Sequence, residues 1–235
     1  LMLRLGLILG SEAPALHAPQ MLVCAADHGL AARGVSAFPS DVTWQMVENF
    51  LAGGAAVSVL ARQHGLALTV VDCGVARDIA PRAAVPGQPQ LLVRKVAAGT
   101  QDASIGPAMT PAQCAQALHN GMDVVRGLPG NALLLGEMGI GNTSVASLLL
   151  ARLCGVSLED CTGAGTGLDA GGVARKRAVL AQALAANEGA VNPLDALAAL
   201  GGFEVATLVG AVLQASSERR VIVVDGFITS AAVLV

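Results

Sequence analysis

The most informative segment for the fold is Ala132-Leu133-Leu134-Leu135-Gly136-Glu137-Met138-Gly139-Ile140-Gly141-Asn142-Thr143-Ser144. Its apolar run has the length of a buried strand, and the glycines stop that run where the chain must turn. Thr143 and Ser144 precede an Ala/Leu-rich segment, residues 145–153, that is long enough for a helix. The segment therefore predicts a buried strand, a glycine turn that carries Glu137, and a helix.

A phosphate is the ligand that such a turn would favour. Backbone N–H groups at the start of a helix lack partners and lie at its positive end. For a lone glycine turn, however, a tight connection without a ligand is the simpler explanation. A second turn, Gly163-Ala164-Gly165-Thr166-Gly167, changes this balance, because two such turns can jointly hold a phosphate. Neither turn is followed by the Lys-Ser/Thr pair of the Walker pattern.

The second turn also suggests two further interpretations. It partly imitates the dinucleotide fingerprint, but its spacing is wrong and no apolar strand directly precedes it, so an NAD-dependent oxidoreductase is a minor alternative. Lys176 follows the turn by roughly two helical turns and can supply a positive charge to a phosphate. Arg175 and Arg177 are more simply explained as a solvated helix face.

The composition narrows the class of protein. Hydrophobic residues make up 54% of the chain, aromatic residues only 2%, and the net charge is −3, which disfavours a nucleic-acid partner. The five cysteines show no metal-binding spacing, so we expect no metal site and a reducing, cytoplasmic location. We also expect no membrane span, because charged residues interrupt every long apolar run: Arg62, Glu137, Arg152 and Glu204.

Strand and helix patterns alternate along the chain. Strands are predicted at residues 21–26, 68–72, 91–96, 132–135 and 221–224, with the third near a sheet edge because it contains Arg94 and Lys95. Helices are predicted at 41–51, where Asp41 or Thr43 is the expected cap, and at 55–63, 110–126, 145–153, 171–187, 193–200 and 203–216. This alternation predicts an α/β fold whose parallel sheet has helices on both faces.

Acidic residues follow four of the predicted strands: Asp27, Asp72, Glu137 and Asp225. In parallel sheets, ligands bind beyond the carboxyl ends of the strands. A single acid at such a position is an ordinary cap or turn residue, but four of them predict one shared crevice. His28 follows Asp27 and is expected to satisfy the local backbone rather than to act in catalysis.

A series of short blocks extends from Met21 through most of the chain. In chain order these are Ala26-Asp27-His28-Gly29, Gly34-Val35-Ser36-Ala37-Phe38-Pro39, Val42-Thr43, Gln45-Met46-Val47, Gly99-Thr100, Gly106-Pro107-Ala108-Met109, residues 136–143, Gly165-Thr166-Gly167-Leu168-Asp169, Lys176, Gly201-Gly202-Phe203-Glu204 and Asp225-Gly226-Phe227. Together, and in this order, they resemble the nicotinate-nucleotide–dimethylbenzimidazole phosphoribosyltransferase family.

The resemblance implies a Rossmann-like α/β domain over residues 21–235 and the end of a small helical domain with a connector over residues 1–20. It implies a homodimer that uses neither a metal nor a cofactor. The implied reaction, in the assembly of the lower ligand of cobalamin, transfers phosphoribose from nicotinate mononucleotide to dimethylbenzimidazole. The products are α-ribazole phosphate and nicotinate.

The resemblance also implies site residues. Phosphate and ribose binding is assigned to Gly139, Gly141, Asn142, Thr143, Gly165, Gly167 and Lys176, and base binding to Ser36, Phe38, Pro39 and Met46. A phenylalanine in a Ser-Ala-Phe-Pro loop of a chain poor in aromatics suits a flat ligand, although Phe38 also fits a core position. Met46 has helical spacing typical of a core residue, so its assignment rests on the resemblance.

Glu137 is the acid that we assign nearest to the chemistry. A phosphate repels a carboxylate, so Glu137 is expected to hold ribose hydroxyls or the benzimidazole N–H. The family's proposed general base is a glutamate in a Gly-Glu-Gly-Ser-Gly segment after the block that matches Asp225-Gly226-Phe227, and the present sequence contains no such segment. We therefore expect the sequence to be part of a longer protein. The alternative is a non-catalytic protein that binds nicotinate mononucleotide or benzimidazole.

Overall fold

The computed structural model describes residues 1–235 and contains a five-stranded, all-parallel sheet in the order β3-β2-β1-β4-β5. The strands are β1 (Gln20–Ala26), β2 (Ala67–Gly74), β3 (Gln90–Val93), β4 (Ala132–Met138) and β5 (Val221–Val223). The predicted α/β fold with a parallel sheet is confirmed, and β3 lies at an edge as expected.

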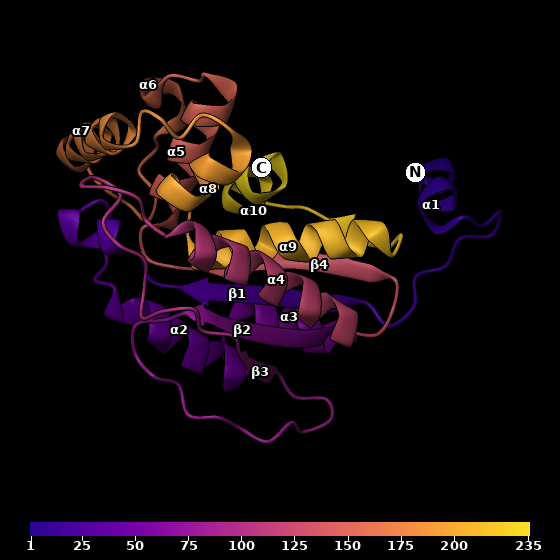
Figure 1. Cartoon of the computed structure of the whole chain (residues 1–235). Helices are drawn as coiled ribbons and strands as arrows, with labels where there is room; N and C mark the ends of the chain where they lie inside the picture. Colours follow the sequence, from indigo (N-terminus) through magenta and orange to yellow (C-terminus); the bar gives the residue numbers. More distant parts are fainter.

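The helices connect the strands and cover both faces of the sheet (Figure 1). They are α1 (Met2–Leu9), α2 (Asp41–Leu51), α3 (Ala56–Gln63), α4 (Pro111–Gly127), α5 (Asn142–Cys154), α6 (Leu158–Cys161), α7 (Ala170–Ala186), α8 (Pro193–Leu200), α9 (Phe203–Ser217) and α10 (Phe227–Leu234), with a 3-10 turn, η1, at Gly29–Arg33.

The two faces of the sheet contribute to two hydrophobic clusters. Successive side chains of a strand point to opposite faces, so Cys24 of β1 joins the large cluster formed with α4 and α9. Val23 and Ala25 instead join the smaller cluster formed with α2 and α3. Alternate residues of a strand therefore contact different helices: one set packs against α4 and α9, and the other against α2 and α3.

Helices α4 and α9 pack closely because each has a glycine at their contact. A Cβ at Gly121 of α4 would lie 2.8 Å from the backbone nitrogen of Ala211 and even closer to the carbonyl of Thr207. A Cβ at Gly210 of α9 would overlap the carbonyl of Leu118 in the same way. This contact fixes the position of α9 on the sheet.

Several boundaries differ from the sequence-based expectations. Gly136 and Glu137 belong to β4 rather than to the turn, because β4 keeps its pairing with β1 through Met138. The β3 strand ends at Val93, although the backbone nitrogens of Arg94 and Val96 still donate hydrogen bonds to the carbonyls of Asp72 and Cys73. Helices α6 and α10 and the turn η1 were not predicted.

The cap of α2 also differs from the prediction. Ser40 occupies the cap position, and the hydroxyl of Thr43 accepts a hydrogen bond from the backbone nitrogen of Ile140 at 3.1 Å. The side chain expected to cap α2 thus binds the glycine turn after β4 instead.

The first helix, α1, lies beside the amino end of the sheet and buries none of its residues (Figure 1). Arg219 connects it to the body of the molecule by donating hydrogen bonds to the carbonyls of Leu7 and Ile8, at 2.7 and 2.9 Å. The assignment of residues 1–20 to a separate helical domain stays a prediction. No helix in the structure combines the length and hydropathy that a membrane crossing requires.

Candidate functional site

Helices α5, α6, α7 and α8 gather beyond the carboxyl ends of the strands, toward which the arrow of β1 points in Figure 1. The turn between β4 and α5 is buried there. Gly141 has a φ of 98° and occupies the cap position of α5, where a side chain would be strained. No side chain caps this helix, so the backbone N–H groups of its first turn have no side-chain partner there.

Lys176 joins the two glycine turns. It lies on α7 with only 1% of its surface exposed, and its Nζ donates a 2.8 Å hydrogen bond to Oγ1 of Thr143. A Cβ at Gly165 would lie 3.3 Å from Nζ and 3.1 Å from Oγ1 of Thr143, so the second turn passes directly over this contact. Burial lowers the pKa of Lys176 to about 8. Three predicted site residues, distant in sequence, therefore meet at one point.

The second turn itself is exposed and includes Gly167, whose φ is 109°. It follows the short helix α6 rather than a strand, and this context does not fit a dinucleotide fingerprint. Of the two arginines that flank Lys176, Arg175 is exposed and Arg177 donates to the carbonyl of Glu159 at 3.0 Å.

The predicted base loop touches the second turn. The hydroxyls of Ser36 and Thr166 lie 3.1 Å apart, which places this loop next to the expected phosphate site. Phe38 is 50% exposed and Pro39 is also exposed, so neither belongs to the core. Met46 is partly buried against the cluster formed with α2 and α3.

Glu137 lies near the end of β4, on the face of the sheet that carries α9. It accepts a hydrogen bond from Nδ2 of Asn142, the first residue of α5. Burial, together with the negative charge of Glu204, raises the pKa of Glu137 to about 7, although the Asn142 hydrogen bond and the His28 charge oppose the increase. A carboxyl group with such a pKa can gain and lose a proton near neutral pH.

The structure places a buried ion pair beside Glu137. Nε2 of His28 lies 2.8 Å from Oε1 of Glu204, and both side chains are buried. The expectation that His28 satisfies the local backbone is wrong, since its ring makes no hydrogen bond to the main chain. Sequence reasoning missed the role of Glu204, although it is the only charged residue in the otherwise apolar and small-residue helix α9.

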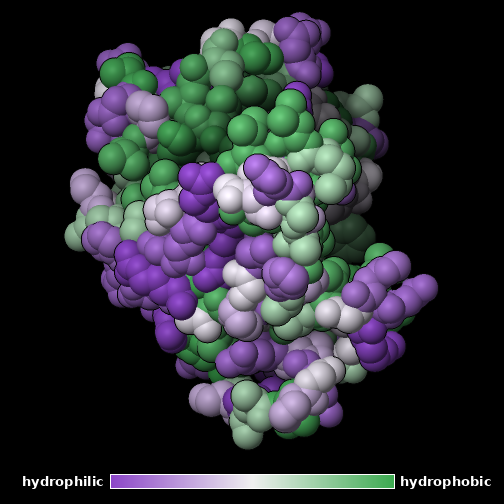
Figure 2. Space-filling model, turned by 90° about the vertical axis from the view of Figure 1, so that its right-hand side faces the viewer, coloured by the Kyte–Doolittle hydropathy of each residue, from purple (hydrophilic) through white to green (hydrophobic).

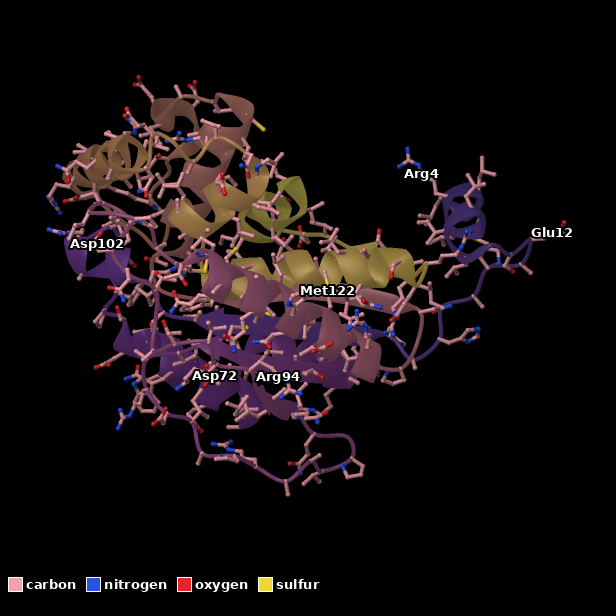
Figure 3. The ribbon with its side chains drawn as sticks, in the orientation of Figure 1. Arg4, Glu12, Asp72, Arg94, Asp102 and Met122 are labelled. Atoms are coloured by element: carbon pink, nitrogen blue, oxygen red, sulfur yellow. The ribbon has the colours of Figure 1, made fainter.

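The other predicted acids do not gather around Glu137. Asp72 has the opposite strand parity: its Oδ1 accepts hydrogen bonds from the backbone nitrogens of Gly74 and Val75, and its Oδ2 lies 3.5 Å from Nζ of Lys95. Figure 3 shows Asp72 on the α2 and β3 side of the molecule.

Asp27 lies near enough to His28 for its charge, like that of Glu137, to raise the pKa of that histidine, whereas Asp225 has separate surroundings. Oδ2 of Asp27 accepts a hydrogen bond from the backbone nitrogen of Ala76 at 2.8 Å. This bond connects the loop after β2 to the end of β1. Asp225 is exposed at the end of β5, and its backbone carbonyl accepts from Thr229. A single crevice shared by all four acids does not form.

A cavity of about 420 Å³ lies elsewhere, near the amino ends of the strands, between the α2–α3 region and Gln88. Its lining includes Ser58, Arg62 and Leu68 but none of the predicted site residues. No three His, Cys, Asp or Glu side chains in the chain come together as a metal site would require.

The fold is that of an α/β protein whose two glycine turns meet at Lys176, and the comparisons with known proteins specify its class. Residues 1–235 match a family described as phosphoribosyltransferase. Among curated proteins, one from Variovorax paradoxus (strain S110) is 75% identical over 235 residues, which are 100% of this chain and 66% of that protein. One from Cupriavidus necator is 53% identical over 238 residues and matches 100% of this chain and 67% of its own length.

Both curated relatives are named nicotinate-nucleotide–dimethylbenzimidazole phosphoribosyltransferase. The crystal structure of CobT from Thermus thermophilus superposes with a TM-score of 0.89 at 40% identity, covering 99% of this chain and 69% of that one. The chain belongs to the nicotinate-nucleotide–dimethylbenzimidazole phosphoribosyltransferase family, and it spans about two thirds of the length of these relatives.

Proposed function

We propose that the protein to which this chain belongs transfers phosphoribose from nicotinate mononucleotide to dimethylbenzimidazole in assembly of the lower ligand of cobalamin. The observation that carries the proposal is the contact of Lys176 with Thr143 beneath Gly165. It places a cation and an uncapped helix start together, as a nucleotide phosphate requires. The 3.1 Å contact of Ser36 with Thr166 brings the loop of Phe38 beside this phosphate site.

The reaction requires one bond to form and one to break. A benzimidazole nitrogen forms a bond to the anomeric carbon of the ribose, while the bond from that carbon to the pyridinium nitrogen of nicotinate mononucleotide breaks. The electron pair stays on that nitrogen, so nicotinate leaves with a neutral pyridine ring. The second benzimidazole nitrogen then releases its proton to a base. Positioning of the attacking nitrogen therefore matters most, and a base helps.

The site residues take distinct roles in this proposal. Gly139, Gly141, Asn142 and Thr143 surround the start of α5 and, with Gly165, Gly167 and Lys176, bind the phosphate and the ribose. The exposed ring of Phe38, together with Ser36, Pro39 and Met46, binds the flat base. Glu137 holds the ribose hydroxyls or the benzimidazole N–H, and its pKa of about 7 lets it exchange a proton at neutral pH.

We also propose that the protein is a homodimer and that it is located in the cytoplasm. Exposed apolar side chains of α1, such as Leu3 and Leu7, and of the β5–α10 region, such as Val224 and Phe227, provide a surface for a second copy. Figure 2 shows hydrophobic residues gathered in the upper half of the face that it views. The five cysteines are free, and four of them are buried, which fits a reducing compartment. Light scattering that gives the mass of a monomer would contradict the dimer.

Product analysis tests the reaction. The protein is incubated with nicotinate mononucleotide and dimethylbenzimidazole, and the mixture is separated by chromatography with mass detection. We expect nicotinate and α-ribazole phosphate in equal amounts, with strongly reduced yield for Lys176→Met. The exposed neighbour provides the control, because Arg175→Met should leave the yield unchanged.

Other outcomes would favour the alternatives. Tight binding of both substrates without any product supports a non-catalytic binding protein. Absence of binding to nicotinate mononucleotide contradicts the proposal altogether. A spectral change of NADH on addition of the protein would support the oxidoreductase instead.

A further inference from the structure

One buried hydrogen bond joins helix α2 to the glycine turn after β4. Thr43 lies in the first turn of α2, and Ile140 lies between the two glycines of that turn. Oγ1 of Thr43 accepts a 3.1 Å hydrogen bond from the backbone nitrogen of Ile140. Because the two residues are only 0% and 4% exposed, water does not compete for this bond.

Thr43 is closely connected to the loop that we assign to the base. The backbone nitrogen of Val42 donates to the carbonyl of Pro39 at 3.1 Å, and that of Thr43 donates to the carbonyl of Ser40 at 2.9 Å. These two bonds close the first turn of α2 directly after Phe38 and Pro39. A β-branched side chain has few rotamers in a helix, so the hydroxyl of Thr43 moves together with this turn.

Ile140 belongs to the turn that we assign to the phosphate and the ribose. The backbone nitrogen of Asn142 donates to the carbonyl of Gly139 at 3.1 Å, which closes the turn around Ile140. Gly139 packs against β1, since a Cβ there would lie 2.5 Å from the carbonyl oxygen of Ala26. The hydroxyl of Thr43 is the partner of the Ile140 N–H, and without it this buried donor would be unpaired.

A second contact between the base loop and a glycine turn is open to water. The hydroxyls of Ser36 and Thr166 lie 3.1 Å apart, but Thr166 is exposed and both residues lie in loops. Water competes for a hydrogen bond at such a place. The bond of Thr43 instead joins a helix to the end of a strand, where Met138 of β4 also packs against the cluster that contains Val47 of α2.

We propose that Thr43 is a positioning residue for the transfer reaction: its hydrogen bond to Ile140 sets the distance between the base, held by α2 and the loop before it, and the phosphoribosyl group, held by the glycine turn. This inference rests on the proposed function. The attacking nitrogen must lie close to the anomeric carbon, and a misplacement of about 1 Å can lower a rate on the order of a hundredfold. Thr43 acts through the two segments that it joins.

Steady-state kinetics of the full protein to which this chain belongs test the inference with Thr43→Val, which keeps the shape of the side chain but loses the hydroxyl. We expect kcat for α-ribazole phosphate formation to fall by about tenfold to a hundredfold. The KM for each substrate should stay within about threefold of wild type, because both binding segments remain. Thr43→Ser keeps the hydroxyl and should retain most of kcat.

Ser58→Ala is the matched control at the other end of α2. Ser58 lies on α3 and is buried, and its hydroxyl donates a 2.8 Å hydrogen bond to the carbonyl of Phe50. Loss of this bond should lower the midpoint of urea unfolding, as Thr43→Val does, but should leave kcat within about twofold of wild type. A lower kcat in Thr43→Val alone therefore separates positioning from a general loss of stability.

Equal kcat values in folded Thr43→Val and Ser58→Ala would overturn the inference and leave the proposed function standing. A raised KM with unchanged kcat in Thr43→Val would do the same, since Thr43 would then support only substrate binding. If the wild-type protein forms no product, the proposed function fails and the inference fails with it. If Thr43→Val does not fold, Thr43→Cys replaces it, because a thiol is a weak acceptor, and an unchanged kcat in that variant contradicts the inference.

Discussion

Lys176 carries its amino group inside the protein, where the single polar contact is the hydroxyl of Thr143. A buried ammonium loses hydration, and its pKa of about 8 expresses that loss. A bound phosphate would restore a negative partner and raise the pKa again. Nucleotide binding and protonation of this one side chain are therefore linked.

The linkage predicts how affinity depends on pH. Above about pH 8 the free protein holds Lys176 as a neutral amine, so binding of nicotinate mononucleotide must take up a proton. We expect the affinity to fall as pH rises through 8, by up to about tenfold per pH unit. Calorimetry over about pH 6.5 to 9.5, in steps of about half a unit, measures it. Lys176→Met should bind more weakly and lose this pH dependence, and a variant that retains it would remove Lys176 from the phosphate site.

Glu137 predicts a pH dependence of stability. Its pKa is raised from 4.5 to about 7, so the folded protein holds this proton more tightly than the unfolded chain. The favourable contribution is complete below pH 4.5 and is lost as pH rises through about 7. Glu137→Gln keeps the size of the side chain but avoids this loss, so its advantage over wild type should grow across this interval to on the order of 3 kcal/mol. Urea unfolding at several pH values measures it, and a constant difference would contradict a buried, titrating Glu137.

At the scale of elements, the molecule depends on helix pairs that approach closely over the sheet. Helix α4 begins with a capping box, in which Thr110 and Gln113 exchange side-chain and backbone hydrogen bonds. Further along, Gly121 lets the backbone of α9 lie against α4. Since α9 also carries Glu204, the packing of two helices determines where a charged group of the site lies.

Two glycines of α4 provide a matched test of this packing. Gly121→Ala should lower the free energy of unfolding by on the order of 3 kcal/mol, because the added methyl group meets backbone atoms of α9 that cannot move aside. Gly127→Ala, in the exposed last position of the same helix with no atom near its Cβ, should change stability by less than about 1 kcal/mol. Denaturant unfolding compares the two variants, and equal effects would mean that the α4–α9 contact is looser than the structure shows.

At the scale of the whole molecule, the side-chain hydrogen bonds that span the longest sequence separation join Arg219 to the end of α1. Helix α1 has no buried residue, and its last carbonyls are held by Arg219, which follows α9. Because so little apolar surface is buried there, the side-chain hydrogen bonds are the main attachment of the helix to the body.

Arg219→Ala should therefore release α1 while leaving the sheet intact. We expect amide hydrogen exchange in residues 2–9 to increase by about tenfold or more, with no change in the strands. Arg4→Ala is the control, since the exposed Arg4 of the same helix has no hydrogen bond or ion pair with the body and should leave exchange near the wild-type rate. Unchanged protection in Arg219→Ala would indicate that another surface holds α1.

Most of the fold was predictable because its signals are local. Apolar runs followed by turn residues located the strands, and the predicted helix ranges that begin at residues 110 and 193 correspond to α4 and α8. Helix α10 was missed because its sequence, Phe-Ile-Thr-Ser-Ala-Ala-Val-Leu, has no clear helical period, and its packing against α5 and α9 decides its conformation.

The candidate site was predictable only in part. The glycine turns and Lys176 could be selected from local sequence, and the structure brings them together, while their role in binding an anion stays a prediction. The prediction of one crevice for four acids failed because position at a strand end says nothing about the face on which a side chain lies. Asp72 and Glu137 both lie near the end of a strand, and yet they meet different helices.

Local sequence was sufficient to establish the alternation of strands and helices, the parallel sheet and the two glycine turns, since each depends on neighbours within a few residues. The strand order, the faces of the sheet and the partners across them depended on tertiary packing. Lys176 meets Thr143, and His28 meets Glu204, because strand register and the close packing of α9 bring distant segments together. Burial shifts the pKa values of Lys176 and Glu137, and neighbouring carboxylates raise that of His28 against the effect of burial; no local sequence pattern contains either cause.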